Sequence, residues 1–323
     1  MNSGASTARP ASAAPEGEVE PGEQTDRPLP FVLGIVGDSG SGKSTICQGV
    51  QTLIGAERVT NVKLDDYLRF SRSDRMERGL TALNPAVHDL SLMQEHLQLL
   101  RNRRSIRNRA YEHADGTFGP LQTLEARDVI LVRGLLGFPT DELRAAYDLA
   151  VFLYPEPDLL FRWKLRRDVR TRGYSEADVL KYIAQHLLDA KEFVHPQAEK
   201  ADMVVRYEVP EWEAPDSEVC TTLTLRRTAA EALQNAIASL DRFGDVIRVH
   251  REGDDVVLRL GNDLPQAEVD AWARERFPTY DPDVVGGFQE EDGGHGVRPQ
   301  LAFIEVLIAR LTQKLRRVDD RKD

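Results

Sequence analysis

The sequence predicts an α/β fold in which a parallel sheet is flanked by helices on both faces and is followed by a smaller α+β C-terminal region. Short apolar runs alternate with helical periodicity over residues 29–210, the pattern of a parallel sheet. The runs lack polar–apolar alternation, as expected for strands that are buried on both faces. A glycine-rich turn follows the first run and opens a helix, which indicates a phosphate-binding crossover.

The elements of the first region follow from its periodicity. The run FVLGIV at 31–36 is apolar throughout and ends in glycine, which favours a buried strand. Leucines at helical spacing predict a helix over 89–102. By the same arguments we expect strands at 58–64, 129–132, 149–153 and 203–207, and helices at 43–53, 157–171 and 175–193.

The two ends of the chain differ from this region. Residues 1–28 are rich in Ala, Ser, Pro, Gly and Glu without hydrophobic periodicity, so we expect a disordered tail. Prolines and acidic residues near 210 suggest a boundary, after which 211–323 forms the α+β region. There we expect strands at 220–226, 246–251 and 255–260, helices at 265–276 and 299–317, and a loop at 279–298.

Composition limits the functional classes. The net charge of -11 disfavours nucleic acid as a partner, although it does not exclude a local basic site. No apolar stretch is long enough for a membrane span, and the N-terminus does not have the pattern of a secretory signal. The two cysteines are expected to be free thiols in a reducing compartment, so we expect a cytoplasmic protein.

The glycine-rich turn matches the P-loop pattern G-x-x-x-x-G-K-[ST] and indicates a sheet of the P-loop NTPase type. Its backbone amides can surround phosphate oxygens, and the lysine places a cation against the β- and γ-phosphates of ATP. The serine hydroxyl can ligate Mg²⁺, and the next residue can reach the α-phosphate. The predicted ATP-binding residues are Gly37, Asp38, Ser39, Gly40, Ser41, Gly42, Lys43, Ser44 and Thr45.

Acceptor chemistry is predicted beside this turn. Asp65 and Asp66 follow the second expected strand, at the edge of the sheet where the P-loop lies. Either carboxylate could orient a hydroxyl or hold Mg²⁺, and the alternative is that they cap the next turn. Cations cluster at 162–172, where they could neutralise a phosphoryl group, although such a run is commonly only a solvated helix face.

These motifs resemble the phosphoribulokinase family, within the wider group of P-loop kinases that includes uridine kinase. The resemblance runs from about 31 to 207 and continues more weakly to the closing helix at 298–315. It is carried by GDSGSGKST (37–45), LDDY (64–67), GLTALNP (79–85), YEHADG (111–116), WKLRRDVRTRGYS (163–175) and PQAEKADMVV (196–205).

The resemblance implies ATP-dependent phosphorylation of D-ribulose 5-phosphate at a primary hydroxyl. It implies ATP and Mg²⁺ as cofactors, a phosphorylated sugar as the small-molecule partner and assembly into a homo-oligomer, a dimer or larger. Asp65 would be the catalytic base, assisted by Lys43 and Arg167, and Asp65 and Ser44 would hold the metal. The implied substrate-binding residues are Arg72, Tyr111, His113, Lys164 and Arg172.

The sequence departs from the family pattern at several polar positions. Arg133 stands where the family has a glutamate that helps to hold Mg²⁺, which reverses the local charge. Asn84 and Ser71 each stand where an aspartate is usual, and Leu68 where a histidine is usual. Ser41 replaces a redox cysteine of chloroplast forms, so no disulfide switch is expected.

Three readings stay open from the sequence. The first is an active sugar-phosphate kinase of the phosphoribulokinase type. The second is a nucleotide-binding protein of altered substrate or little catalysis, which the residues Arg133 and Asn84 favour. The third is a nucleoside kinase of the uridine kinase type, against which the YEHADG motif and the long second region count.

Overall fold

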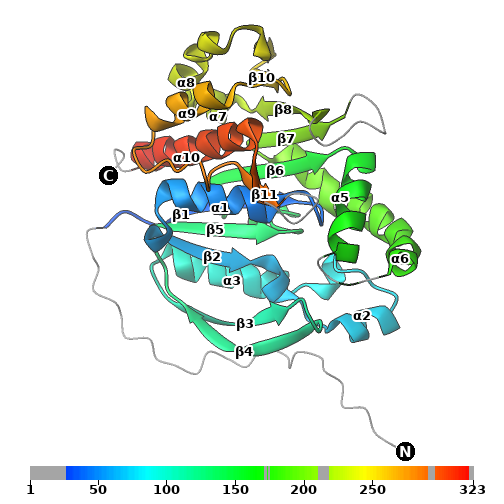
Figure 1. Ribbon diagram of the computed structural model, residues 1–323. Coiled ribbons are helices and arrows are strands. Elements are labelled where there is room, and N and C mark those ends of the chain that lie inside the picture. Colours follow the sequence, from blue (N-terminus) through cyan, green and yellow to red (C-terminus); the bar gives the residue numbers. More distant parts are fainter. Residues whose placement is uncertain (1–26, 171–172, 174, 210–217, 290–294, 320–323) are drawn as a thin grey trace, which may run out of the picture.

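The computed structural model describes residues 27–170, 173, 175–209, 218–289 and 295–319. Most of the predicted tail, residues 1–26, and the predicted substrate residue Arg172 lie outside these ranges. Eight strands form one central sheet in the order β2-β5-β1-β6-β7-β8-β10-β9 (Figure 1). None of the helices in the described ranges has the length and hydropathy that a bilayer crossing needs.

The sheet has a parallel half and an antiparallel half. In the parallel half lie β2 (Val59–Lys63), β5 (Val129–Gly134), β1 (Phe31–Gly37), β6 (Leu149–Pro155) and β7 (Met203–Glu208). In the antiparallel half lie β8 (Cys220–Leu225), β10 (Asp255–Leu260) and β9 (Ile247–Glu252). The predicted α/β class is confirmed. The division near residue 210 stays a prediction, and β7 and β8 pair across it in one sheet.

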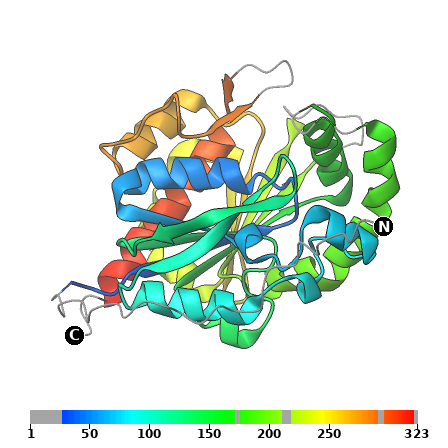
Figure 2. The ribbon, with the colours of Figure 1, turned by 90° about the horizontal axis from the view of Figure 1, so that it is seen from below.

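Helices cover both faces of the sheet, because side chains of successive strand residues point to opposite faces. On one face lie α1 (Lys43–Ile54), α7 (Arg227–Ala232), α8 (Gln234–Ala238), α9 (Gln266–Arg274) and α10 (Pro299–Asp319). On the other face lies α3 (Leu90–Arg101), as Figure 2 shows. Buried apolar side chains form two cores, one on each face of the sheet. The core that includes α1 and α10 extends over both the parallel and the antiparallel half.

The remaining elements surround the carboxyl ends of the parallel strands or flank the sheet. They are the short helices η2 (Leu64–Tyr67), α2 (Arg72–Glu77) and α4 (Asp141–Arg144), the helices α5 (Pro157–Arg170) and α6 (Glu176–Asp189), and the hairpin β3 (Ile106–Glu112) and β4 (Thr117–Leu124). Figure 1 shows α5 and α6 beyond the ends of β6 and β7. This arrangement places α5, α6, the β3–β4 hairpin and the P-loop around the carboxyl ends of the parallel strands.

Three local features of the structure differ from the expectations. The hairpin β3–β4 was not predicted, because arginines occupy alternate positions of β3 and conceal its apolar face. The expected loop at 279–298 contains a short ribbon of β11 (Gly287–Gln289) and β12 (His295–Val297), so the prediction of a loop throughout is wrong. The helix predicted to reach 193 ends its α-helical part at Asp189 and continues as a π-helical turn to Val194.

A buried carboxyl joins α1 to α10. The side chain of Glu305 is fully buried against Gly49, where an added Cβ atom would clash with Glu305 Oε2. Oε2 accepts a hydrogen bond of 2.7 Å from the Gly286 amide, and Oε1 has no partner among the described residues. Burial raises the pKa of Glu305 well above its usual range, which this single hydrogen bond only partly offsets. Glu305 is therefore expected to be protonated in the folded protein.

Replacing Glu305 with glutamine should flatten the dependence of stability on pH. A raised pKa means that the folded state binds more protons than the unfolded state. The free energy of unfolding therefore falls as the pH rises above the pKa that the carboxyl has in the unfolded state. Between pH 5 and pH 8 the wild type should lose unfolding free energy relative to Glu305→Gln, because the unfolded state releases a proton that the folded state keeps. Urea unfolding at several pH values measures this, with Glu268→Gln on the exposed face of α9 as the control.

Candidate active site

The turn between β1 and α1 forms an anion cradle. Gly40 and Gly42 have φ of 94° and 86°, in the left-handed region that favours glycine. Gly42 caps α1 without any side-chain hydrogen bond, so the amides of the first helical turn have no capping side chain. Helix α5 lies directly beside the turn, because a Cβ atom added at Gly40 would be 3.6 Å from Cα of Lys164. The cradle therefore offers backbone donors between α1 and α5.

Lys43 lies within this cradle. Its Nζ donates to the carbonyl oxygens of Gly37 at 2.9 Å and of Asp38 at 2.5 Å. Burial lowers the pKa of Lys43 to about 8, although the charges of Asp38 and Asp65 act in the opposite direction. The ammonium group is thus held at the turn by carbonyl oxygens that a phosphate could replace as acceptors.

Helices α5 and η5 (His195–Lys200) close one side of the turn. Arg167 Nη2 donates to Ser39 Oγ at 3.1 Å, and its Nε donates to Asp168. The buried Asp38 lies 3.5 Å from His195 Nε2. Burial raises the pKa of Asp38, but the His195 contact and the charges of Lys164 and Lys43 bring the net shift below its usual value. Asp38 is therefore ionised and holds the cationic side of the site in place.

Lys164 is buried and contacts a histidine of α6. Its Nζ donates to His186 Nδ1 at 2.5 Å. Burial and then the charge of Lys164 lower the pKa of His186 to about 4, so this imidazole is neutral at pH 7 and accepts the hydrogen bond. The structure therefore brings two predicted cations, Lys164 and Arg167, next to the P-loop. Thr45 lies partly exposed in the first turn of α1.

Asp65 stands at the end of β2, on η2. Its Oδ2 lies 3.1 Å from Nε2 of His113, which comes from the turn of the β3–β4 hairpin. Burial raises the pKa of Asp65, but the bond and charge of His113, followed by His88 and Lys43, lower it to about 2. Asp65 is thus ionised at neutral pH, and its charge interacts favourably with that of Lys43.

The neighbouring Asp66 has a structural contact. Its Oδ1 accepts a hydrogen bond of 2.8 Å from the Tyr111 amide, which fastens the hairpin to η2. Tyr111 is buried, and Arg72 donates through Nη2 to the carbonyl oxygen of His113. The carboxylate of Asp65 thus contacts the His113 side chain, whereas the carboxylate of Asp66 accepts from the backbone of the hairpin.

Several residues that position the site were missed in the sequence. Arg75 is buried and donates to Tyr111 Oη at 2.9 Å and to the Phe70 carbonyl at 2.7 Å. His88, also buried, contacts the Ala82 carbonyl through Nε2 at 2.7 Å. The third is His195 beside Asp38. None of these three residues belongs to a spacing pattern. In the sequence each is a single arginine or a lone histidine, which is too weak a signal to predict a site.

Arg133, at the end of β5, contacts the P-loop directly. Its Nη1 donates to Ser44 Oγ at 2.6 Å. Strands β1 and β5 are parallel neighbours with Ile35 opposite Arg133, so the end of β5 reaches the turn that follows β1. A guanidinium group therefore occupies the position beside the hydroxyl that was predicted to ligate Mg²⁺.

The protein residues beside the P-loop supply few ligands for Mg²⁺, so the ion that accompanies ATP would be held mainly by the nucleotide phosphates. Mg²⁺ needs hard oxygen ligands, commonly one or two carboxylates together with substrate phosphates. Here Ser44 Oγ accepts from a cation, and within the described ranges no three His, Cys, Asp or Glu side chains form a group that could hold a metal. The metal roles expected for Ser44 and Asp65 therefore stay predictions.

The other unusual positions have structural roles. Ser71 caps α2 in a capping box with Asp74. Asn84 Oδ1 accepts from the Ala86 amide at 2.9 Å and caps a short helix. Leu68 is buried and forms a β-bridge with His88. These three side chains shape the segment between η2 and α3.

Comparisons with known proteins identify the family of this chain. Residues 32–211, more than half of the chain, match the Phosphoribulokinase / Uridine kinase family. A phosphoribulokinase of Synechocystis sp. is 33% identical over 183 residues, which cover 57% of this chain and 54% of that protein. The chloroplastic phosphoribulokinase of Triticum aestivum is 27% identical over 307 residues, which cover 88% of this chain and 72% of that protein. The chain thus spans about half the length of the first relative.

A solved structure shares the fold. The phosphoribulokinase from Rhodobacter spheroides superposes with a TM-score of 0.58 at 17% sequence identity, covering 76% of this chain and 94% of that one. Kinases of the matched family use ATP with Mg²⁺ to phosphorylate an alcohol group. The chain belongs to the phosphoribulokinase/uridine kinase family of P-loop kinases.

Proposed function

We propose that this protein is an ATP-dependent kinase that phosphorylates a primary hydroxyl of a sugar phosphate, with D-ribulose 5-phosphate as the first candidate. One observation carries the proposal: the ionised Asp65, paired with His113, lies in the electrostatic environment of Lys43 at the same edge of the sheet as the P-loop. A phosphoryl donor and an acceptor hydroxyl bound there would be adjacent, as in-line transfer requires.

The donor side would act through fixed positive charge. The amides of the cradle and Lys43 would bind the β- and γ-phosphates, and Arg167 would approach from α5, where it now contacts Ser39. Phosphoryl transfer needs neutralisation of the equatorial oxygens more than covalent assistance. These groups would supply that neutralisation.

The acceptor side would act through Asp65. Because His113 occupies Oδ2, the other oxygen of Asp65 is the one open to the sugar hydroxyl. With a pKa near 2 the carboxylate is fully ionised, so it would orient the hydroxyl and receive its proton as the O–P bond forms. Arg72 and Tyr111 would bind the phosphate that the sugar already carries. Arg72 lies against the hairpin that contains Tyr111.

Arg133 would provide a further cation at the donor phosphates. Its guanidinium already lies 2.6 Å from Ser44 Oγ, in the first turn of α1. Arginine presents several donors in a planar fork that matches phosphate oxygens. On binding of nucleotide we expect Arg133 to exchange Ser44 for a phosphate oxygen.

The proposal is tested by a coupled assay of ADP formation with a panel of acceptors. Ribulose 5-phosphate should give the highest kcat/KM, other pentose and hexose phosphates lower values, and uridine no turnover. Turnover with uridine alone would favour a nucleoside kinase. No turnover with any acceptor, together with intact ATP binding, would favour the second candidate, a nucleotide-binding protein without catalysis, which the contact between Arg133 and Ser44 supports.

Reversing the charge of Arg133 distinguishes these candidates. Arg133→Glu should raise the Kd for ATP and lower kcat/KM by about 10²-fold, since loss of one charge-stabilising donor has about that effect. The control is Arg104→Glu, the same change at an exposed arginine after α3. A large gain of activity in Arg133→Glu would instead mean that the arginine suppresses a metal-dependent kinase, which would contradict its assignment as a cation for the donor phosphates.

Two broader expectations remain predictions. Assembly into a homo-oligomer is expected from the family resemblance, and sedimentation of the full chain would test it. A cytoplasmic location is expected from the two free cysteines, Cys47 and Cys220.

A further inference from the structure

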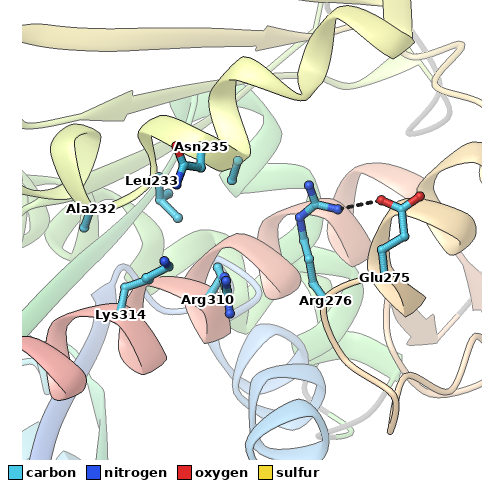
Figure 3. A pocket seen from close by; sticks show the side chains of 8 residues that line it. Ala232, Leu233, Asn235, Glu275, Arg276, Arg310 and Lys314 are labelled. Atoms are coloured by element: carbon cyan, nitrogen blue, oxygen red, sulfur yellow. Dashed lines mark hydrogen bonds and ion pairs between the residues drawn. The ribbon is translucent and has the colours of Figure 1, made fainter.

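A second basic site lies apart from the P-loop and the acceptor side. A cavity of about 210 Å³ opens between α7 and α8, the end of α9 and the second half of α10. Figure 3 shows Arg310 and Lys314 on α10, with Lys314 extending toward Leu233, and the guanidinium of Arg276 turned to Glu275. None of its lining residues belongs to the P-loop, η2 or the β3–β4 hairpin.

The charges of the cavity are unbalanced. Glu275 is the single carboxylate in the lining. Both of its oxygens accept from Arg242, at 2.9 and 3.0 Å, and Oε2 also accepts from Nη1 of Arg276 at 3.2 Å. Arg310 donates to the neutral amide of Gln313 at 3.0 Å, and no described residue forms a hydrogen bond or ion pair with Lys314. Two cations one helical turn apart therefore face the cavity without a carboxylate of their own, an arrangement that is unfavourable without an anion.

The third cation is held rigidly. Arg276 donates to the Trp272 carbonyl at 2.8 Å, to Ser239 Oγ at 2.7 Å and to Glu275 Oε2 at 3.2 Å. Its guanidinium lies 4.3 Å from the centre of the Trp272 ring. Only 14% of its side chain is exposed. Burial lowers the pKa of Arg276. The hydrogen bond and charge of Glu275 oppose this shift, and the charges of Arg310 and Arg242 act with burial. The position of this guanidinium is thus set before any ligand arrives.

We infer that this cavity binds a small phosphate monoester, whose phosphate is held by Arg276, Arg310 and Lys314. Phosphate oxygens match a fork of guanidinium donors together with an ammonium group. Leu233 and Ala236 are buried and supply an apolar wall for a short carbon body. The volume is below the roughly 300–1,000 Å³ of sites for drug-sized ligands, which suits a phosphate on a body of a few carbons. The inference does not depend on the proposed kinase activity.

Calorimetric titration of the full chain tests this site. Because the P-loop and the proposed acceptor site would also bind phosphate, the titration is made in the background of Lys43→Ala with Arg72→Gln, with inorganic phosphate and with glycerol 3-phosphate as separate probes. One site should remain for glycerol 3-phosphate, and its affinity should fall as salt increases. Inorganic phosphate should bind more weakly, since it cannot use the apolar wall. Absence of any remaining site for either probe would overturn the inference.

Variants of α10 assign the remaining site. Arg310→Gln with Lys314→Gln should raise the Kd about ten- to hundredfold, since two charge-assisted contacts are lost. Arg248→Gln, an exposed arginine on β9 in the same half of the sheet, is the control and should leave the Kd unchanged. If the double variant does not fold, Lys314→Gln alone carries the test. An unchanged Kd in the folded variant would refute the site.

Discussion

Replacing Asp65 with asparagine should lower kcat by about 10²-fold or more while ATP still binds. The carboxylate is the group placed to receive the proton of the acceptor hydroxyl, and a positioned base contributes about 10²- to 10⁴-fold. Asparagine keeps the shape and still allows a contact with His113, but it cannot take the proton. Steady-state kinetics with ribulose 5-phosphate, together with an ATP titration, measures both quantities.

The adjacent carboxylate provides the matched control. Asp66→Asn retains an oxygen that can accept from the Tyr111 amide, so its kcat should change by less than about threefold. Since the pKa of Asp65 is near 2, its ionisation should cause no fall of kcat between pH 5 and pH 8. Equal losses in the two variants, or unchanged turnover in Asp65→Asn, would remove the role of Asp65 as base.

Replacing Lys43 with alanine should abolish measurable ATP binding, with the Kd raised by about 10²-fold or more. The variant loses a charge-assisted contact to the phosphates, and the carbonyl oxygens of Gly37 and Asp38 are left facing an anion. Isothermal titration with ATP measures the change. The control is Lys191→Ala, which removes an exposed lysine from the π-helical turn after α6.

The pKa of Lys43 adds a pH dependence to this prediction. Its value of about 8 means that part of the free protein loses the ammonium charge above pH 8, and ATP then binds only with uptake of a proton. The Kd for ATP should therefore rise as pH increases from 8 to 9.5 in the wild type. A retained affinity in Lys43→Ala would contradict the placement of the phosphates.

The central fold could be predicted because its signals are local. Each parallel strand is a short apolar run, and Gly42 with Lys43 marks where the first strand passes into a helix. The β3–β4 hairpin could not be predicted in the same way. Its exposed side carries arginines, and its position depends on a long-range contact between Tyr111 and Asp66.

The site was predictable in its residue types and less so in its contacts. Asp65 and His113 were named from motifs 48 positions apart, and the structure brings them together. The pairing of Arg133 with Ser44 depends on β5 lying beside β1, which is a property of strand order rather than of either motif. Arg75 donates a hydrogen bond to Tyr111 Oη, and no periodic pattern marks a single buried arginine.

A crystal structure of the protein with a non-hydrolysable ATP analogue tests the central claim most directly. The β- and γ-phosphates should lie against the amides from Gly40 to Ser44, with Nζ of Lys43 turned from the carbonyl oxygens to the phosphates and Arg133 within hydrogen-bonding distance of a phosphate oxygen. An analogue bound elsewhere, or a cradle still filled by Lys43 and Arg133 at saturating nucleotide, would contradict the account.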